Sequence, residues 1–162
     1  MRPHPAALRL AAAAVTAATL FAPTSASATT TTPNDAWVPC KYGMTSNMYW
    51  APGQSLAYGS RWCVGQYQLA MQNDGNLVIY DVNGLGLWST QTWGHPGADA
   101  IMQNDGNLVV QQNNQPLWNS RTGGNTGSYY YLCFQLDGNL VIYAPVPGTG
   151  PCKGAPRWNS NT

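Results

Sequence analysis

Side chains able to hydrogen-bond recur at every second position of a nine-residue stretch that the chain repeats three times. The first copy carries Gln72, Asp74, Asn76, Val78 and Tyr80. The carboxylate accepts hydrogen bonds, the amides and the phenol both donate and accept, and the valine offers a small apolar surface. A sugar needs this combination, because its hydroxyls donate and accept while its C–H face requires apolar contact. The pattern therefore indicates a shallow, open pocket for a neutral polar ligand.

The other two copies differ in how completely they preserve this set. The last copy keeps all five side chains, as Gln135, Asp137, Asn139, Val141 and Tyr143. The middle copy keeps four, because a glutamine stands where tyrosine is expected; its members are Gln103, Asp105, Asn107, Val109 and Gln111. Glutamine can still bond a hydroxyl, but it lacks the ring. We therefore predict two complete sites and a third that is weakened or silent.

A purely structural interpretation also exists for each copy, namely a hairpin whose turn residues are solvated. Turns recruit Asp, Asn and Gly freely, so a single copy fits that interpretation equally well. Three copies that also keep a glutamine, which the turn does not need, favour binding for the two complete motifs. For the middle copy the two interpretations remain open.

Short runs rich in β-branched and aromatic residues, bounded by Gly, Asn, Asp and Pro, predict an all-β chain. Asp74-Gly75 and its two counterparts each join two such runs, which predicts three hairpins with a two-residue Asp-Gly turn of positive φ. Another strand candidate, Ser55 to Tyr58, precedes the first motif, and we assign it to the first repeat unit.

Each unit closes with a tryptophan, and these are Trp88, Trp118 and Trp158. The motifs begin 31 and 32 residues apart, at Gln72, Gln103 and Gln135. A unit of this length is too small to bury its own apolar face, so the three units must share one core. We expect a closed three-sheet arrangement with pseudo-threefold symmetry, in which the three tryptophans meet near the axis and belong to the core.

Nothing in the chain indicates an enzyme or a metal site. A glycosidase needs two carboxylates about 5–10 Å apart, whereas each motif holds a single aspartate. No Ser-His-Asp signature surrounds His95, and one carboxylate per loop is too few for calcium. The cysteine spacing has no CxxC pair, which argues against zinc. We therefore expect no catalysis, no cofactor and no metal.

The amino terminus has the features of an export signal. Arg2 and Arg9 precede an apolar run too short to span a bilayer, and Ala26-Ser27-Ala28 is a cleavage site. We assign residues 1–28 to a signal peptide, 29–43 to a lead-in and 44–162 to the binding domain, and we expect a secreted, extracellular protein. Removing the signal leaves five basic residues against six acidic ones, which offers no footprint for nucleic acid. No other run is long enough for a membrane span.

Four cysteines in an exported chain predict two disulfides, and three pairings are possible. We favour Cys40–Cys63 and Cys133–Cys152, because each closes a short loop. The second pair would tie down a Pro/Gly-rich loop that lengthens the third unit.

The two complete motifs match the Q-x-D-x-N-x-V-x-Y pattern of the bulb-type mannose-binding lectin family. The resemblance covers about Asn47 to Thr162. It implies a β-prism II fold, with three four-stranded antiparallel sheets around a pseudo-threefold axis. It also implies that Asp and Asn hold the axial 2-hydroxyl of mannose, Gln the 3-hydroxyl and Tyr the 4-hydroxyl, while Val packs on the ring carbons.

The function expected from the resemblance is binding of mannose or mannose-containing glycans and polysaccharides, with avidity from several weak sites. One alternative is an antibacterial lectin-like toxin of the same fold. A second is a secreted hydrolase carrying a sugar-binding prism, although too few residues remain for a catalytic domain. The family also suggests a homodimer formed by exchange of the C-terminal strand, here Arg157 to Thr162.

Overall fold

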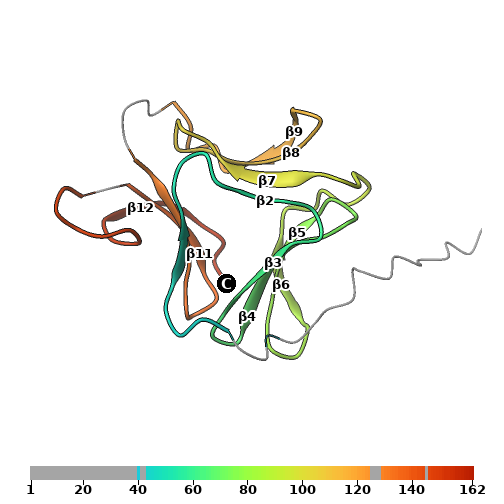
Figure 1. The fold of residues 1–162 in the computed structure, drawn as a ribbon, viewed down its shortest axis with the longest axis horizontal. Helices are drawn as coiled ribbons and strands as arrows, with labels where there is room; N and C mark the ends of the chain where they lie inside the picture. The colour runs from blue at the N-terminus through green and yellow to red at the C-terminus, as the bar shows by residue number, and fades with distance from the viewer. Residues whose placement is uncertain (1–39, 41–42, 125–128, 145) are drawn as a thin grey trace, which may run out of the picture. The chain divides into compact units, whose positions relative to one another are not determined.

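The described part of the polypeptide folds into twelve short strands that form three four-stranded antiparallel sheets (Figure 1). The structure, a computed structural model, describes residues 40, 43–124, 129–144 and 146–162. The predicted signal peptide, residues 1–28, and most of the predicted lead-in lie outside these residues. Over the described part of the chain there is no helix, and hence none that is long and apolar enough to cross a membrane. The expectation of three four-stranded sheets is confirmed.

The first sheet is built from one continuous stretch of chain. Its strands lie in sequence order and are β3 (Arg61–Val64), β4 (Tyr67–Met71), β5 (Leu77–Tyr80) and β6 (Gly86–Ser89). The first motif lies on the β4–β5 hairpin. Ile79 pairs with Trp88 and Tyr80 with Gly86, so Leu87 is skipped, which marks a β-bulge on β6. The other two sheets repeat this bulge at the equivalent position.

The other two sheets each take three strands from one repeat unit. The second contains β7 (Asp99–Met102), β8 (Leu108–Gln112) and β9 (Gln115–Asn119). The third contains β10 (Tyr131–Phe134), β11 (Leu140–Ala144) and β12 (Ala155–Asn159). Their fourth strands come from the segment before the first motif: β1 (Met48–Trp50) pairs with β10, and β2 (Ser55–Leu56) pairs with β7.

The pairing of β2 corrects one prediction from the sequence. Ser55 pairs with Ile101 and Leu56 with Ala100, so this strand completes the second sheet and not the first. Two residues are too few to show a preference for any sheet, because strand pairing depends on contacts distant in sequence. The N-terminal segment therefore links all three repeat units, running alongside β10 and then β7 before it enters β3 (Figure 1).

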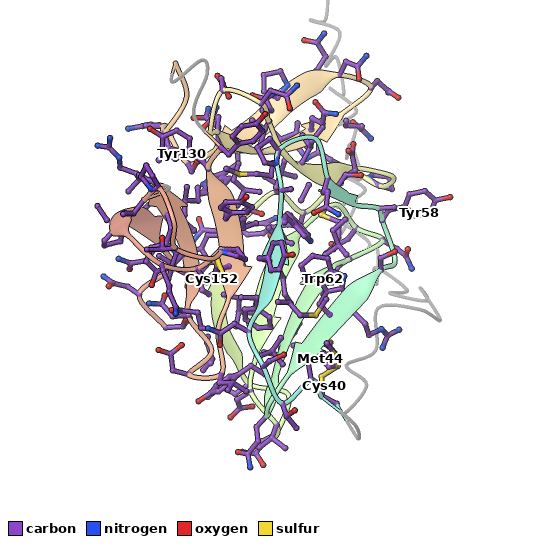
Figure 2. The ribbon with its side chains drawn as sticks, turned by 60° about the vertical axis from the view of Figure 1, so that its left-hand side comes forward. Cys40, Met44, Tyr58, Trp62, Tyr130 and Cys152 are labelled. Atoms are coloured by element: carbon purple, nitrogen blue, oxygen red, sulfur yellow. A yellow bond between two sulfur atoms is a disulfide. The ribbon has the colours of Figure 1, made fainter. Side chains whose placement is uncertain are left out.

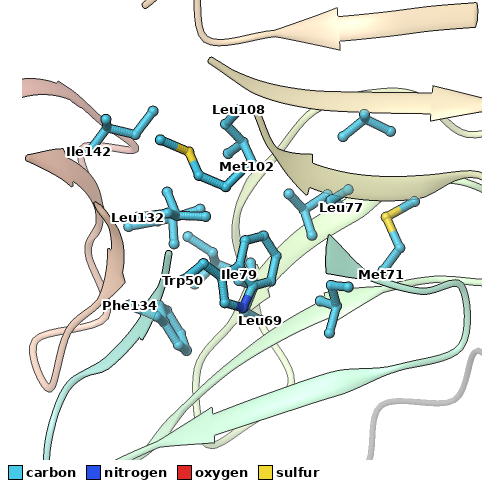
Figure 3. Packing of buried hydrophobic residues seen from close by; sticks show 14 of the residues in the cluster. Trp50, Leu69, Met71, Leu77, Ile79, Met102, Leu108, Leu132, Phe134 and Ile142 are labelled. Carbon is cyan, nitrogen blue, oxygen red and sulfur yellow. The ribbon is translucent and has the colours of Figure 1, made fainter. Parts of the chain in front are cut away.

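The three sheets share one hydrophobic core. On β5 the inward side chains of Leu77 and Ile79 are fully buried, as the period-two alternation of a strand requires. Leu132 of β10 and Met102 of β7 meet them from the other sheets (Figure 3). Trp50 of β1 is fully buried among these side chains, so the borrowed strand supplies one of the largest side chains of the core.

The three repeated tryptophans meet one another. The ring centroids of Trp88 and Trp118 are 5.6 Å apart, those of Trp88 and Trp158 5.5 Å, and those of Trp118 and Trp158 5.7 Å. All three pairs are edge-to-face, the geometry that aromatic rings favour. The prediction that these tryptophans meet is confirmed, and they pack, partly buried, against the core cluster. We call them the tryptophan triangle.

Two disulfides form, with the pairing favoured from the sequence. Cys40 bonds to Cys63 on β3, and Cys133 on β10 bonds to Cys152 (Cys40 and Cys152 are labelled in Figure 2). The loops they close span 23 and 19 residues. In the chain-entropy model each such bond stabilises the fold by about 3 kcal/mol. The second bond anchors the long loop that precedes β12.

The motif turn differs from the predicted two-residue Asp-Gly turn. Gln72 N–H donates to Asn76 C=O at 2.9 Å, and Gly75 N–H donates to Gln72 C=O at 3.1 Å. Only Gly75 has a positive φ, 93°, so the loop is a three-residue one ending in a glycine bulge. A Cβ on Gly75 would also overlap the backbone oxygen of His95. The two-residue turn with two positive φ angles occurs instead at Asn113 and Asn114, between β8 and β9.

Candidate functional site

Strand alternation places the motif side chains together on the outer side of each hairpin. On β5, Leu77 and Ile79 point into the core, so Val78 and Tyr80 lie on the opposite face. Gln72 follows the end of β4, beside the start of the turn. The five side chains of the first copy therefore surround one hairpin, and we call this arrangement site 1. The same residues of the last copy, on the β10–β11 hairpin, form site 2.

Gln and Tyr join the two ends of each complete site. In site 1, Gln72 Nε2 donates to Tyr80 Oη at 2.8 Å, and in site 2, Gln135 Nε2 donates to Tyr143 Oη at 3.1 Å. This bond crosses from the end of one strand to the next strand and fixes both side chains. The Gln side-chain oxygen is left as an acceptor beside the phenol. The structure thus brings together the residues that the sequence predicted to cooperate.

The motif aspartate divides its two oxygens between the turn and the surface. Asp74 Oδ1 accepts from Asn76 N–H at 2.9 Å, and Asp137 Oδ1 accepts from Asn139 N–H at 3.0 Å. Within the described residues no donor reaches Oδ2 of either aspartate. The turn therefore holds each carboxylate in place through Oδ1, while Oδ2 stays open as an acceptor for a ligand hydroxyl.

The motif asparagine is oriented by groups beneath it. Asn76 is 8% exposed, and its Oδ1 accepts from the hydroxyl of Thr90 and from the backbone N–H of Thr92, each at 3.2 Å. Among the described residues, only one buried side-chain polar atom lacks a hydrogen-bond partner, and it is Trp50 Nε1. The amide NH₂ of Asn76 is therefore not a buried, unpaired group and keeps contact with solvent. The asparagine thus keeps its donor open on the same turn that holds Asp74.

The groups that hold this asparagine form a repeated feature that our sequence interpretation missed. Two residues after each tryptophan of the triangle comes a Ser or Thr, then any residue, then a Thr. The three segments are Thr90–Thr92, Ser120–Thr122 and Ser160–Thr162. Their middle residues, Gln91, Arg121 and Asn161, all have φ near +60°. This pattern could have been recognised in the sequence, because it recurs at the same place in each repeat unit.

The same bonds recur in each segment. The first hydroxyl accepts from the backbone N–H after the motif asparagine and donates to the asparagine Oδ1, as Ser160 does with Leu140 and Asn139. The second hydroxyl donates to the carbonyl of the motif glycine, as Thr162 does with Gly138 at 2.8 Å. Each turn and its asparagine are therefore fixed from behind by two hydroxyls.

Replacing Thr90 by Val should destabilise the protein and weaken site 1. The buried Leu77 N–H donates to Thr90 Oγ1 at 3.1 Å and would lose its acceptor, which costs about 1–3 kcal/mol. Urea unfolding measures this loss. Thr90→Ser is the matched control, because the other copies carry Ser120 and Ser160 there, and it should cost about 1 kcal/mol or less. Equal losses in both variants would contradict the role of the hydroxyl.

The middle copy departs from the two complete sites at a second point besides Gln111. The backbone N–H of Gly124 donates to Asp105 Oδ2 at 3.2 Å, on the oxygen that stays open in the other copies. A Cβ on the neighbouring Gly123 would lie 2.6 Å from the same oxygen. The turn itself is intact, since Asn107 N–H still bonds Asp105 Oδ1 at 3.0 Å. The copy keeps the hairpin of a site, but the carboxylate oxygen that is open in the other copies already accepts one backbone N–H here.

Outside the three motifs, Asp81 has a structural role. The backbone N–H of Leu85 holds the pKa of Asp81 below its ordinary value, with that of Asn83 adding to the effect. This aspartate organises the β5–β6 loop through bonds of 2.8 Å to both groups. A general acid would need a raised pKa. In the described part of the chain, no three His, Cys, Asp or Glu side chains gather where they could hold a metal ion.

Comparisons with known proteins find mannose-specific lectins among the relatives of this chain. No family model matches the chain. It is 43% identical over 91 residues to a mannose-specific lectin of Aloe arborescens, covering 53% of this chain and 83% of that sequence. It is 39% identical to the mannose-specific lectin of Galanthus nivalis, but spans only 39% of that longer sequence.

Two solved structures share the fold. A monomeric monocot mannose-binding lectin from Gastrodia elata matches with a TM-score of 0.61 and 36% identity, covering 70% of this chain and 96% of that one. The snowdrop agglutinin (Galanthus nivalis), solved with methyl-α-D-mannoside, matches with a TM-score of 0.57 and 37% identity, covering 68% of this chain and 99% of that one.

Proposed function

Because this chain belongs to the family of monocot mannose-binding lectins, with their β-prism II fold, we propose that it binds mannose or mannose-containing glycans at site 1 and site 2. Binding involves no chemical step. The middle copy, whose Asp105 carboxylate is occupied by Gly124 N–H, contributes structure only. The relatives that support this proposal are named as lectins and not as toxins, so the antibacterial alternative gains no support from them.

One observation carries the proposal: both complete copies combine the Gln–Tyr bond with an aspartate oxygen that no described donor reaches. In each copy the open oxygen accepts from a sugar hydroxyl while the neighbouring asparagine NH₂ donates to one. A hydroxyl that meets an acceptor and a donor together is well satisfied, and a charge-assisted bond contributes about 1.5–3 kcal/mol. We assign this pair to the axial 2-hydroxyl of mannose. Gln and Tyr then serve the 3- and 4-hydroxyls, and Val78 or Val141 lies under the ring carbons.

Two binding sites on different sheets make the protein a cross-linker. Site 1 belongs to the first sheet and site 2 to the third, so each can engage a different branch of one glycan or two separate chains. Weak single sites gain avidity in this way. We further propose that the chain is exported, which the predicted signal and the two disulfides support. Since β12 pairs with β11 of its own chain, one chain completes all three sheets, and strand exchange in a dimer stays a prediction.

Calorimetric titration with methyl α-mannoside and methyl α-glucoside tests the proposed function. We expect two equivalents of mannoside per chain and at least roughly tenfold weaker binding of the glucoside, because its equatorial 2-hydroxyl leaves the Asp–Asn pair unsatisfied. Equal affinity for both sugars would contradict the assigned role of that pair. Release of sugar from a mannan in a separate incubation with the protein would show a hydrolase instead.

A further inference from the structure

We propose that Trp93 forms a second sugar subsite beside site 1, which takes the pyranose next to the bound mannose in an oligosaccharide. This inference rests on the proposed function and extends it from a single sugar to a glycan of two or more residues. Trp93 is 59% exposed, and no ring contact involves it among the described residues. A tryptophan this open has most of its large apolar face available to a ligand.

The backbone that carries Trp93 is fixed directly against site 1. On one side of it, Thr92 N–H donates to Asn76 Oδ1 at 3.2 Å, and Thr92 Oγ1 donates to Gly75 C=O at 2.6 Å. On the other side, His95 N–H donates to Asp74 C=O at 2.9 Å. Trp93 thus lies between two residues bonded to the motif turn. Consecutive Cα atoms are only about 3.8 Å apart, so the Cα of Trp93 lies one residue from a contact to the turn of site 1.

The segment is also braced internally. His95 Nδ1 is 3.1 Å from Thr92 C=O, and Ala98 N–H donates to His95 C=O at 3.1 Å. An aromatic platform on a braced backbone loses little freedom when a ligand settles on it, which favours affinity. The backbone that carries the exposed indole is therefore fixed to the turn of site 1 by contacts that do not involve the ring itself.

The middle copy provides an internal comparison. Its residue equivalent to Trp93 is Gly123, which follows Thr122 as Trp93 follows Thr92. There the chain folds over the motif, and Gly124 N–H occupies Asp105 Oδ2. In site 1 the same position carries a large aromatic ring and the Asp74 carboxylate stays open. Equivalent segments of two repeats thus differ: in the middle copy the segment bonds the motif aspartate, and in site 1 it carries an exposed indole.

The chemistry of an indole face selects the ligand. Stacking requires a sugar that presents several axial C–H bonds on one side, as a hexopyranose does, and it makes no demand on the hydroxyl pattern. The second subsite is therefore expected to discriminate weakly between hexoses, while the Asp–Asn pair sets the preference for the first. The contribution of such a contact, about 0.5–1.5 kcal/mol, corresponds to roughly three- to tenfold in affinity.

Titration of Trp93→Gly with methyl α-mannoside and with α-linked mannobiose and mannotriose tests the inference. The Trp93→Gly variant is compared with a protein that keeps Trp93, and both carry Asp137→Asn so that only site 1 is measured. We expect unchanged affinity for the monosaccharide and a roughly three- to tenfold loss for the oligosaccharides, largely recovered in Trp93→Phe. Tyr129→Gly is the matched control, because Tyr129 is 68% exposed and its neighbour Tyr130 lies against Gly106 of the middle copy, and it should change neither affinity.

The outcomes separate this inference from the proposed function. If methyl α-mannoside binds site 1 but the oligosaccharides bind equally well with and without Trp93, the subsite is refuted and the proposed function stands. If methyl α-mannoside does not bind the unmodified protein at all, the proposed function fails and the subsite fails with it. A loss of monosaccharide binding in Trp93→Gly would also overturn the subsite, since it would place the indole in site 1 itself.

Discussion

Replacing Asp74 and Asp137 together by Asn should abolish mannose binding without unfolding the protein. Asparagine keeps the Oδ1 acceptor that bonds Asn76 N–H or Asn139 N–H, so the turns remain. It exchanges the open, charged oxygen for an NH₂ group, which then faces the NH₂ of the motif asparagine. Each site loses a charge-assisted bond and gains two donors with no acceptor, which should weaken it by at least roughly tenfold to a hundredfold.

The single variants and one control make this prediction specific. Asp74→Asn should leave one mannoside bound per chain with unchanged affinity at site 2, and a chain with one site should no longer precipitate a branched mannan. Asp105→Asn is the control, because its Oδ2 already accepts from Gly124 N–H and should serve no sugar. Calorimetry gives the stoichiometry and thermal unfolding checks the fold. Loss of a binding equivalent in Asp105→Asn would show that the middle copy is an active site.

Removing one member of the tryptophan triangle should cause the largest loss of stability of any side chain near the axis. Trp88→Ala deletes the ring that contacts both Trp118 and Trp158 and joins the first sheet to the other two. We expect the free energy of unfolding to fall by about 3 kcal/mol, at the lower end of large-to-small aromatic substitutions because the indole is half-buried. Urea unfolding measures the change.

Two comparisons test the cause of this loss. Trp88→Phe keeps an aromatic ring and should cost clearly less, whereas Trp93→Ala removes an exposed indole and should stay within about 0.5 kcal/mol. A double-mutant cycle between Trp88 and Trp118 should give a coupling of about 0.5–1.5 kcal/mol. A loss below about 1 kcal/mol in Trp88→Ala would mean that the sheets are held together by the deeper core alone.

Features carried by repetition could be predicted from the sequence. The hairpins followed from Asp-Gly between apolar runs, and the meeting of Trp88 with its two counterparts followed from their equal place in three equivalent units. The disulfide pairing also agreed, because Cys40 and Cys133 each have a close partner along the chain. Repetition makes such features predictable, because a local pattern that occurs three times constrains how the units can be joined.

Features that depend on distant or exact pairing could not be predicted. The turn type follows from how many residues separate the last paired positions, here Met71 and Leu77, and Asp-Gly alone does not specify that number. The destination of β2 depends on contacts with Ile101, far along the chain. The contact of Gly124 with Asp105 was equally invisible, because it arises from a glycine pair with no side-chain signature.

The borrowed strands β1 and β2 have a consequence for the order of assembly. During synthesis Trp50 emerges long before its partner Leu132, so this large apolar side chain has no burial place until the third unit exists. The β4–β5–β6 meander can form early from local pairings, whereas closure of the other two sheets waits for nearly the whole chain. Such distant pairings slow folding into a range of about milliseconds to seconds. Among the described strands, β1 and β2 are thus the first to be made and among the last to pair.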